Sequence, residues 1–161
     1  GLMSGTSDAQ FSPHAFTTRR MVATILWRLE GAPVVNYAML FTDVEEAWYG
    51  EAVRWAAASG IVNGCSSERF APNAPITRQQ MAAILYRYAS YKGLDVSMGG
   101  GTDLLRYEDA SQSADYALPA LRWACGMGLM QGTEGRLLPG GWAARAQVAA
   151  LLRRFHETML K

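Results

Sequence analysis

The sequence predicts an all-α fold built from three helix-loop-helix repeats. This prediction rests on one pattern that recurs three times within 161 residues, and on apolar residues spaced i, i+3, i+4 and i+7 in each recurrence. Half of the residues are hydrophobic and only 18% are charged, so the chain has enough apolar surface to form a core. A two-helix unit cannot bury its apolar face alone. We therefore expect the repeats to pack together as one domain, residues 1–161.

The repeats cover nearly the whole chain, as a partial first repeat (1–33), a complete second repeat (41–92) and a third repeat (107–158). The shared second half of the unit reads Ile61-Val62-Asn63-Gly64, Phe70-Ala71-Pro72-Asn73 and Ile76-Thr77-Arg78 in repeat 2, followed by an apolar helix. Repeat 1 follows the same order from Ser4-Gly5 to Thr18-Arg19, and repeat 3 from Gln131-Gly132 to Ala144-Arg145.

The first half of the unit occurs only twice. Phe41-Thr42-Asp43-Val44 leads to Trp55-Ala56, and Tyr107-Glu108-Asp109-Ala110 leads to Trp123-Ala124. Repeat 1 lacks this stretch, so we expect the chain to begin partway through a unit, after its opening helix. Apolar surface would then be exposed, and residues that precede this chain or a second molecule would cover it, by self-association or helix exchange.

Each complete repeat should contain two helices. The first has a stripe formed by Trp48, Ala52, Trp55 and Ala56, which Tyr116, Ala120, Trp123 and Ala124 reproduce, and Gly60, Gly126 and Gly128 mark its end. The second has stripes at Val22, Ile25, Leu26 and Leu29, at Met81, Ile84, Leu85 and Tyr88, and at Val148, Leu151, Leu152 and Phe155. The glycine-rich segment from Lys92 to Thr102 is the expected linker.

Composition and motifs exclude several classes of function. Fifteen Lys and Arg against fourteen Asp and Glu give a net charge of +1, which disfavours a nucleic-acid partner. No apolar run is long enough to span a membrane. Two cysteines are too few for a disulfide framework or a four-thiolate metal site. Because no phosphate loop, metal-ligand spacing or nucleophile motif is present, we expect no enzyme activity, no cofactor and no metal.

The three arginines at the start of the second helices, Arg19, Arg78 and Arg145, are the best candidate binding residues. Thr77 and Gln80 form a capping-box pattern that predicts the helix start, and Thr18 should cap in the same way. An arginine in the first helical position is unfavourable by about 0.3 to 1 kcal/mol, because the helix dipole is positive there. Its recurrence in all three repeats therefore suggests a function.

Two interpretations of these arginines remain open. In the first, each guanidinium pairs with Asp43 or Asp109 of a neighbouring repeat and joins the repeats together. In the second, the guanidinium and the free amides at the helix start form a pocket for an anion. The arginines near the helix C-termini, Arg28, Arg87 and Arg154, suit the dipole and are expected to be solvated structural residues.

These residues resemble the S-layer homology domain. Repeat 2 has nearly the whole family pattern, from Phe41-Thr42-Asp43-Val44 through Gly60-Ile61-Val62-Asn63-Gly64 to Ile76-Thr77-Arg78-Gln79-Gln80-Met81. The resemblance implies a pseudo-threefold helical bundle with prongs, located outside the cell at the cell surface or cell wall. It also implies noncovalent anchoring to bacterial cell-wall polysaccharide, typically a secondary polymer with a pyruvylated amino sugar. The ligand-binding residues that it implies are Arg19, Arg78, Arg145, Asp43, Asp109, Thr77, Gly64 and Gly132.

The chain departs from the family pattern at several positions. Met21, Gln80 and Gln147 replace the glutamate of the family's Thr-Arg-Ala-Glu motif, and Ala144 replaces its threonine in repeat 3. The third groove is the one that these changes affect most. The alternative function is a helical-repeat protein-interaction module in which the same arginines are structural.

Overall fold

The computed structural model describes residues 3–7, 9–44 and 48–161. Its five α-helices are α1 (Arg19–Leu29), α2 (Gly50–Ala58), α3 (Arg78–Tyr91), α4 (Leu118–Gly126) and α5 (Arg145–Met159). Two short 3₁₀ helices, η1 (Ala110–Gln112) and η2 (Asp115–Ala117), precede α4. The described residues contain no β-strand beyond isolated bridges, so the all-α prediction is confirmed.

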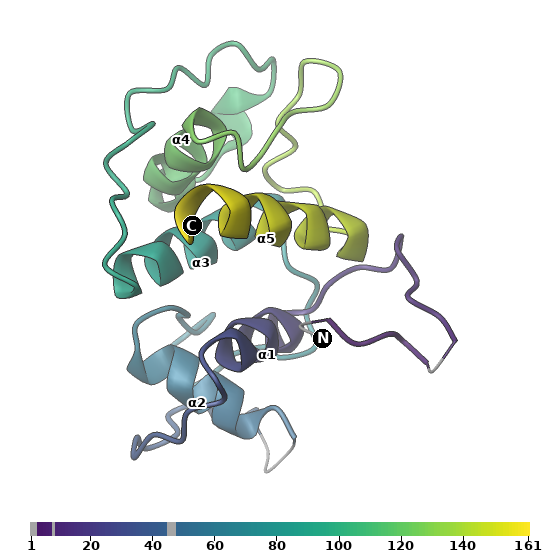
Figure 1. Cartoon of the computed structure of the whole chain (residues 1–161), viewed down its shortest axis with the longest axis vertical. Coiled ribbons are helices and arrows are strands. Elements are labelled where there is room, and N and C mark those ends of the chain that lie inside the picture. The colour runs from purple at the N-terminus through teal and green to yellow at the C-terminus, as the bar shows by residue number, and fades with distance from the viewer. Residues whose placement is uncertain (1–2, 8, 45–47) are drawn as a thin grey trace.

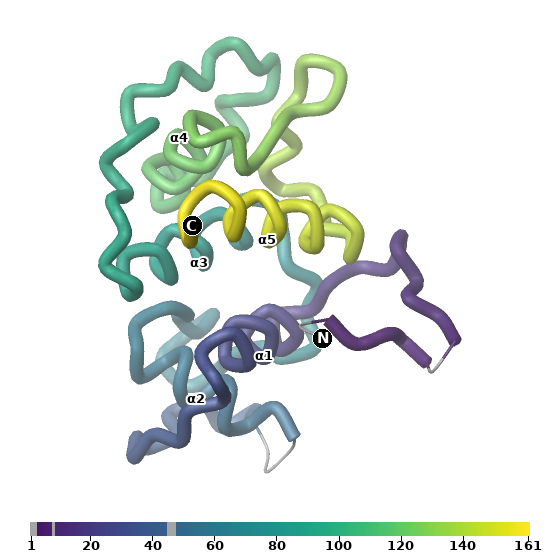
Figure 2. Tube along the Cα trace, viewed as in Figure 1, coloured from purple at the N-terminus to yellow at the C-terminus, as the bar shows by residue number. Residues whose placement is uncertain are grey.

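The longer helices α1, α3 and α5 run through the middle of the molecule, and the shorter α2 and α4 lie outside them (Figure 1). Helix α2 packs on α1, and α4 packs on α3. The segment after α3 crosses the outside of the molecule before it reaches α4, where the sequence predicts a linker (Figure 2). These contacts place the second helix of one repeat against the first helix of the next.

One apolar core joins all five helices. The predicted stripes of the second helices lie in it, and so do Trp55 and Trp123, which are 1% and 0% exposed. The rings of Tyr88 and Phe155 lie 5.8 Å apart, and those of Trp123 and Phe155 lie 6.4 Å apart. Contacts of this kind supply the burial that a single two-helix unit lacks.

The segments just before α1, α3 and α5 are connected in a ring. Isolated β-bridges pair Thr18 with Pro75, Thr77 with Trp142, and Phe16 with Ala144. Each bridge therefore joins one repeat to another, and three bridges return to the starting repeat. The segments before the three longer helices are thus linked in turn, and the pseudo-threefold arrangement stays a prediction of the family resemblance.

Two predictions about local structure are wrong. Trp48 and Tyr116 lie outside the helical stripes and are 61% and 55% exposed, because α2 begins only at Gly50 and Tyr116 lies in η2. Thr18 occupies the N-cap position of α1, but its side chain makes no capping bond. The capping box at Thr77 and Gln80 is confirmed, with both reciprocal hydrogen bonds present.

Candidate ligand-binding grooves

Each helix-start arginine reaches across to a loop of another repeat. The Arg19 guanidinium donates from Nε to the Phe70 carbonyl at 2.8 Å and from a terminal nitrogen to the Asn63 carbonyl at 2.7 Å. Arg78 donates in the same way to the carbonyls of Leu137 and Gln131, and Arg145 to those of Phe11 and Ser4. Charge-assisted bonds to carbonyl oxygens offset the dipole penalty of a cation at a helix start.

The two aspartates hold the same loops from the other side. Asp43 accepts hydrogen bonds from the amides of Phe70 and Ala71 at 2.8 and 2.7 Å, and Asp109 accepts from those of Leu137 and Leu138 at 2.7 and 2.8 Å. Burial alone would raise the pKa of both carboxyls, but these amide donors hold it below its ordinary value. Each aspartate is thus connected to an arginine through a loop.

The second residue of each amide pair, Ala71 or Leu138, has a left-handed backbone, with φ of 57° and 53°. Such a conformation costs of order 1 to 3 kcal/mol in a residue other than glycine. The aspartate bond to the amide of that residue fixes the turn where the loop meets the arginine. Asp43 and Asp109 therefore shape the site from behind it.

Both interpretations of the arginines need correction. Within the described residues, no salt bridge joins Arg19, Arg78 or Arg145 to a carboxylate, so the repeats are joined through backbone carbonyls instead. The amides at the helix starts are also not free. The Arg78 amide donates to the Gly141 carbonyl and the Gln79 amide to that of Pro139, both at 2.9 Å, and α1 and α5 have equivalent bonds. The first two amides of each of these helices are therefore not available to an anion.

A groove lies beside each arginine. The repeat-2 groove, of about 310 Å³, is lined by the loop Asn63-Gly64-Cys65, by one face of α3, by Arg19 and by Tyr116. The α3 face consists of Gln80, Ala83, Ile84 and Arg87, which follow the i, i+3, i+4, i+7 spacing of one helix face. Three repeats contribute to this groove, since Arg19 comes from repeat 1 and Tyr116 from repeat 3.

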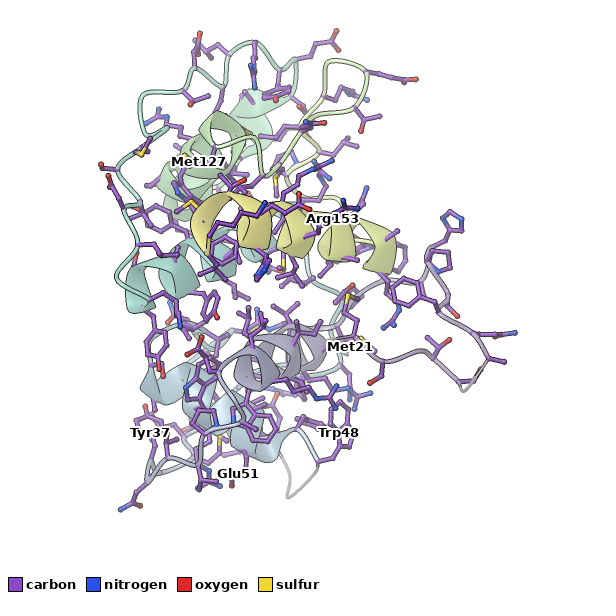
Figure 3. All side chains as sticks on the ribbon, viewed as in Figure 1. Met21, Tyr37, Trp48, Glu51, Met127 and Arg153 are labelled. Carbon is purple, nitrogen blue, oxygen red and sulfur yellow. The ribbon has the colours of Figure 1, made fainter. Side chains whose placement is uncertain are left out.

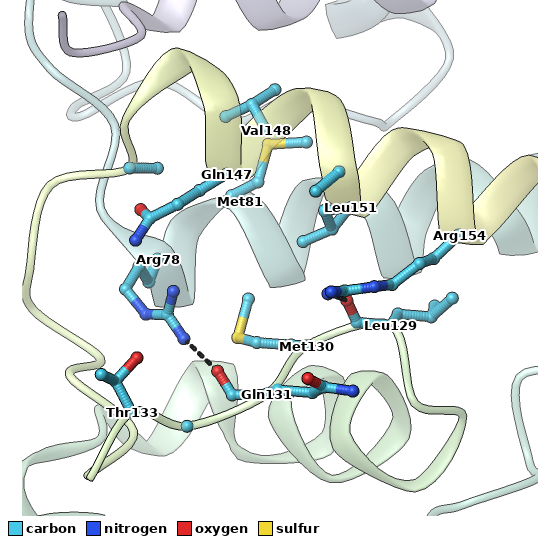
Figure 4. A pocket seen from close by; sticks show the side chains of 13 residues that line it. Arg78, Met81, Leu129, Met130, Gln131, Thr133, Gln147, Val148, Leu151 and Arg154 are labelled. Carbon is cyan, nitrogen blue, oxygen red and sulfur yellow. Dashed lines mark hydrogen bonds between the residues drawn. The ribbon is translucent and has the colours of Figure 1, made fainter. Parts of the chain in front are cut away.

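The repeat-3 groove, of about 220 Å³, has the same plan (Figure 4). Arg78 lies on one side and donates to the Gln131 carbonyl at 2.8 Å. Gln147 and Arg154 project from α5, with Arg154 at the end of the groove away from Arg78, and Gly132 and Thr133 belong to the loop. None of the residues that line this groove is aromatic.

The repeat-1 groove, of about 450 Å³, lies between Arg145 of α5 and Arg28 of α1. Its loop is Ser4-Gly5-Thr6, and Trp48 supplies an aromatic side chain. Met21, which takes the place of Gln80 and Gln147, lies on the same side of the molecule as Trp48 (Figure 3). This groove is therefore less polar at the start of its helix than the other two.

Five of the eight predicted site residues line these grooves: Arg19, Arg78, Arg145, Gly64 and Gly132. The two glycines are required by close approach, because a Cβ on Gly64 would lie 2.6 Å from the Phe41 ring and one on Gly132 would lie 2.7 Å from the Arg136 carbonyl. Asp43, Asp109 and Thr77 lie behind the grooves and hold the loop or the helix start.

Sequence reasoning missed the second arginine of each groove. Arg28, Arg87 and Arg154 were expected to be solvated structural residues, but each lines a groove. The signal was present, since each of these arginines follows the third helical residue by seven positions and therefore shares its face. Trp48 and Tyr116 were missed because they were assigned to the core stripe.

Tyr116 lines the repeat-2 groove together with Arg19 and Arg87. Burial raises the pKa of the Tyr116 phenol above its ordinary value, while the positive charges of Arg87 and Arg19 act in the opposite direction. The phenol therefore remains protonated at neutral pH and can donate a hydrogen bond into the groove.

Neither a membrane-spanning helix nor a metal-binding cluster occurs in the described residues. None of the helices there is both long and apolar enough to cross a membrane. The same residues contain no group of three or more His, Cys, Asp or Glu side chains placed to bind a metal ion.

Comparison with known proteins identifies a family. The S-layer homology domain matches residues 40–82, which include Asp43, the loop with Gly64 and the start of α3. A surface-layer 125 kDa protein of Lysinibacillus sphaericus is 30% identical over 168 residues and covers 99% of the chain. The chain is therefore a cell-surface anchoring module, located outside the cell at the cell surface or cell wall.

Relatives also include large enzymes. An endoglucanase of Bacillus sp. (strain KSM-635) is 32% identical over 152 residues, and an amylopullulanase of Thermoanaerobacterium thermosulfurigenes is 28% identical over 153 residues. Both alignments cover 94% of this chain. The chain spans 16% of the endoglucanase, 13% of the surface-layer protein and 8% of the amylopullulanase.

Proposed function

We propose that this chain, which carries an S-layer homology domain, is a noncatalytic anchor that binds an acidic cell-wall polysaccharide in its arginine-lined grooves. The carboxylate of a pyruvylated amino sugar is the proposed anion. Arg19, Arg78 and Arg145 form one wall of the grooves, and Gly64 and Gly132 let the loops of the opposite wall pack closely against Phe41 and Tyr107. Asp43, Asp109 and Thr77 hold these walls in position.

One observation carries the proposal. The same combination recurs in all three grooves: an arginine from one repeat, a glycine loop from another, and a second arginine on the helix of that loop's own repeat. Two guanidinium groups around an open groove favour an anionic ligand, because guanidinium pairs well with carboxylate. Repetition around the molecule suits a polymer, since several weak sites on one chain raise its avidity.

The test is sedimentation of the chain with purified cell walls. We expect most of the protein to pellet with untreated walls and to remain in solution after acidic substituents are removed by mild acid. Salt should weaken the binding, because charge contributes to it. Undiminished binding to the stripped walls would contradict the proposal.

The proposed protein-interaction alternative makes a different prediction for Arg78→Ala. Loss of the two bonds from Arg78 to the Leu137 and Gln131 carbonyls should lower the melting temperature in either case. If the grooves bind glycan, cosedimentation with walls should fall as well. Wild-type binding to walls by both Arg78→Ala and Arg19→Ala would favour the alternative.

A further inference from the structure

The two arginines of the repeat-2 groove differ in how many of their hydrogen-bond donors remain free for a ligand. Arg19 is only 7% exposed, and its Nε and one terminal nitrogen already donate to the Phe70 and Asn63 carbonyls. Its guanidinium also lies 4.7 Å from the centre of the Phe70 ring. The geometry of Arg19 is therefore fixed, and two of its five N–H donors are occupied before any ligand arrives.

Arg87 is in the opposite situation. It is half-buried on the groove face of α3, and within the described part of the chain its guanidinium makes no hydrogen bond and no salt bridge. Its equivalents are both engaged, Arg154 with the Leu129 carbonyl at 3.2 Å and Arg28 with the Ser4 hydroxyl at 3.3 Å. Arg87 alone of the three retains its full set of donors among these residues.

Two more donors surround the same space. Tyr116 lines the groove together with both arginines, its phenol is protonated, and the residue is 55% exposed. Gln80 uses its carbonyl oxygen to accept from the Thr77 amide, so its amide nitrogen remains available toward the groove. Guanidinium, phenol and amide together suit a carboxylate, and an exposed aromatic ring suits the face of a sugar.

Resting on the proposed function, we infer that Arg87 and Tyr116 bind the carboxylate-bearing sugar in the repeat-2 groove, and that Arg19 is a positioning residue that holds the loop. The repeat-2 groove is then the principal site of the molecule. The repeat-3 groove lacks an aromatic residue, and its second arginine is already bonded. A polymer chain would bind first in the repeat-2 groove.

The thiol of Cys65 provides a direct measure of whether a ligand occupies this groove. It is exposed and lines the repeat-2 groove, whereas Cys125, the other cysteine of the sequence, is buried. The rate of alkylation of Cys65 by iodoacetamide therefore reports whether the groove is occupied. The probe is purified acidic wall polymer added to the full chain, and we expect it to slow alkylation of Cys65 in the wild type.

The decisive variant is Arg87→Gln. We expect its affinity for the polymer to fall by about tenfold or more, its Cys65 to lose protection and its melting temperature to stay unchanged, since Arg87 makes no bonds within the described fold. Arg87→Lys should retain part of the protection. Arg122→Gln, which changes an exposed arginine of α4 that lies outside the three grooves, is the matched control and should behave as the wild type.

Arg19→Gln tests the positioning role of Arg19, as distinct from the ligand-binding role of Arg87. We expect it to lower the melting temperature, because the loop loses two carbonyl contacts. If Arg87→Gln binds the polymer with the same affinity as the wild type, and if its Cys65 is protected equally, the inference is overturned while the proposed function stays intact. A wild type that does not bind the acidic polymer would overturn both.

Two chemical treatments of the polymer identify which sugar substituent carries the carboxylate. Mild acid removes pyruvyl ketals, and carbodiimide-mediated reduction neutralises uronic acids. Loss of Cys65 protection after the first treatment assigns the carboxylate to the ketal, and loss only after the second assigns it to a uronic acid. Protection that survives both treatments would contradict carboxylate recognition by Arg87.

Discussion

Arginine at the first position of a helix is an unfavourable choice for an isolated helix, and this fold compensates for it with carbonyl oxygens from another repeat. The dipole penalty is about 0.3 to 1 kcal/mol. Two hydrogen bonds from a charged donor contribute about 1.5 to 3 kcal/mol each. Because the bonds cross between repeats, as from Arg78 to Leu137 and Gln131, the residue that disfavours its own helix stabilises the assembly.

Two threonines in equivalent positions should differ in their effect on stability. Thr77→Ala removes a complete capping box and should lower the free energy of unfolding by about 1 kcal/mol. Thr18→Ala removes a buried hydroxyl that has no hydrogen-bond partner within the described residues, so its effect should be near zero or slightly stabilising. Urea unfolding of both variants checks the difference, and equal losses would contradict it.

Asp43 and Asp109 should make stability depend on acid pH. Their pKa values are lowered in the folded protein, so their contribution is full above the ordinary pKa of 3.8 and is lost as pH falls through the lower folded value. The double variant Asp43→Asn, Asp109→Asn should be less stable at pH 7 by a few kcal/mol. Its free energy of unfolding should also fall less steeply than that of the wild type below about pH 4. Parallel pH profiles for the two proteins would count against this account.

At the scale of elements, the two short helices each place one tryptophan in the core and leave one aromatic residue outside. In α4, Trp123 is fully buried and lies 5.5 Å from the ring of Tyr86 on α3. Tyr116 precedes α4 by two residues and faces the repeat-2 groove. Because α4 begins only at Leu118, Tyr116 lies before the helix in η2, so one aromatic residue packs and the other remains available to a ligand.

Substitution of these aromatic residues should separate packing from binding. Trp123→Ala should lower the free energy of unfolding by about 3 to 5 kcal/mol, because it leaves a large cavity in the core. Trp48→Ala should change it by less than about 1 kcal/mol, since Trp48 is 61% exposed. Thermal unfolding measures both, and a comparable loss of stability in Trp48→Ala would show that this residue belongs to the core.

For the whole molecule, the three long helices are not equally covered. Ala23 of α1 and Ala82 of α3 are 0% exposed, but the equivalent Ala149 of α5 is only partly buried. At the position of Tyr86, which packs on Trp123, α5 has the exposed Arg153. A largely apolar cavity of about 460 Å³ adjoins this face, lined mainly by Met3, Phe11, Leu29, Ala149, Leu152, Phe155 and Leu160.

The sequence predicts that residues preceding this chain or a second molecule cover this apolar surface, and self-association of the chain is the alternative that light scattering tests. The expected result is an apparent mass that rises with protein concentration in light scattering, together with binding of an apolar dye that falls as the mass rises. Ala149→Glu places a charge on the surface and should keep the chain monomeric without unfolding it. A strictly monomeric wild type that binds no dye would contradict the prediction.

Sequence reasoning located one wall of the grooves and missed the other. The arginines at the helix starts, Arg19 among them, are predictable because they break a local rule three times. Arg87 breaks no rule, since a cation near a helix C-terminus is favourable, and its place beside Arg19 depends on how repeats 1 and 2 meet. Tyr116 was hidden for a similar reason, because helical spacing assigned it to a core stripe that begins after it.

The sequence by itself determined that the chain is helical, that it is built from repeats and that their helix starts carry arginine, because periodicity and local capping act within a few residues. Only the tertiary structure decided what those arginines contact, that the amides beside them are occupied, and that a second arginine and an aromatic residue complete two of the grooves. Each of these facts depends on contacts between residues of different repeats. Separations of about 40 to 140 residues lie beyond any local pattern.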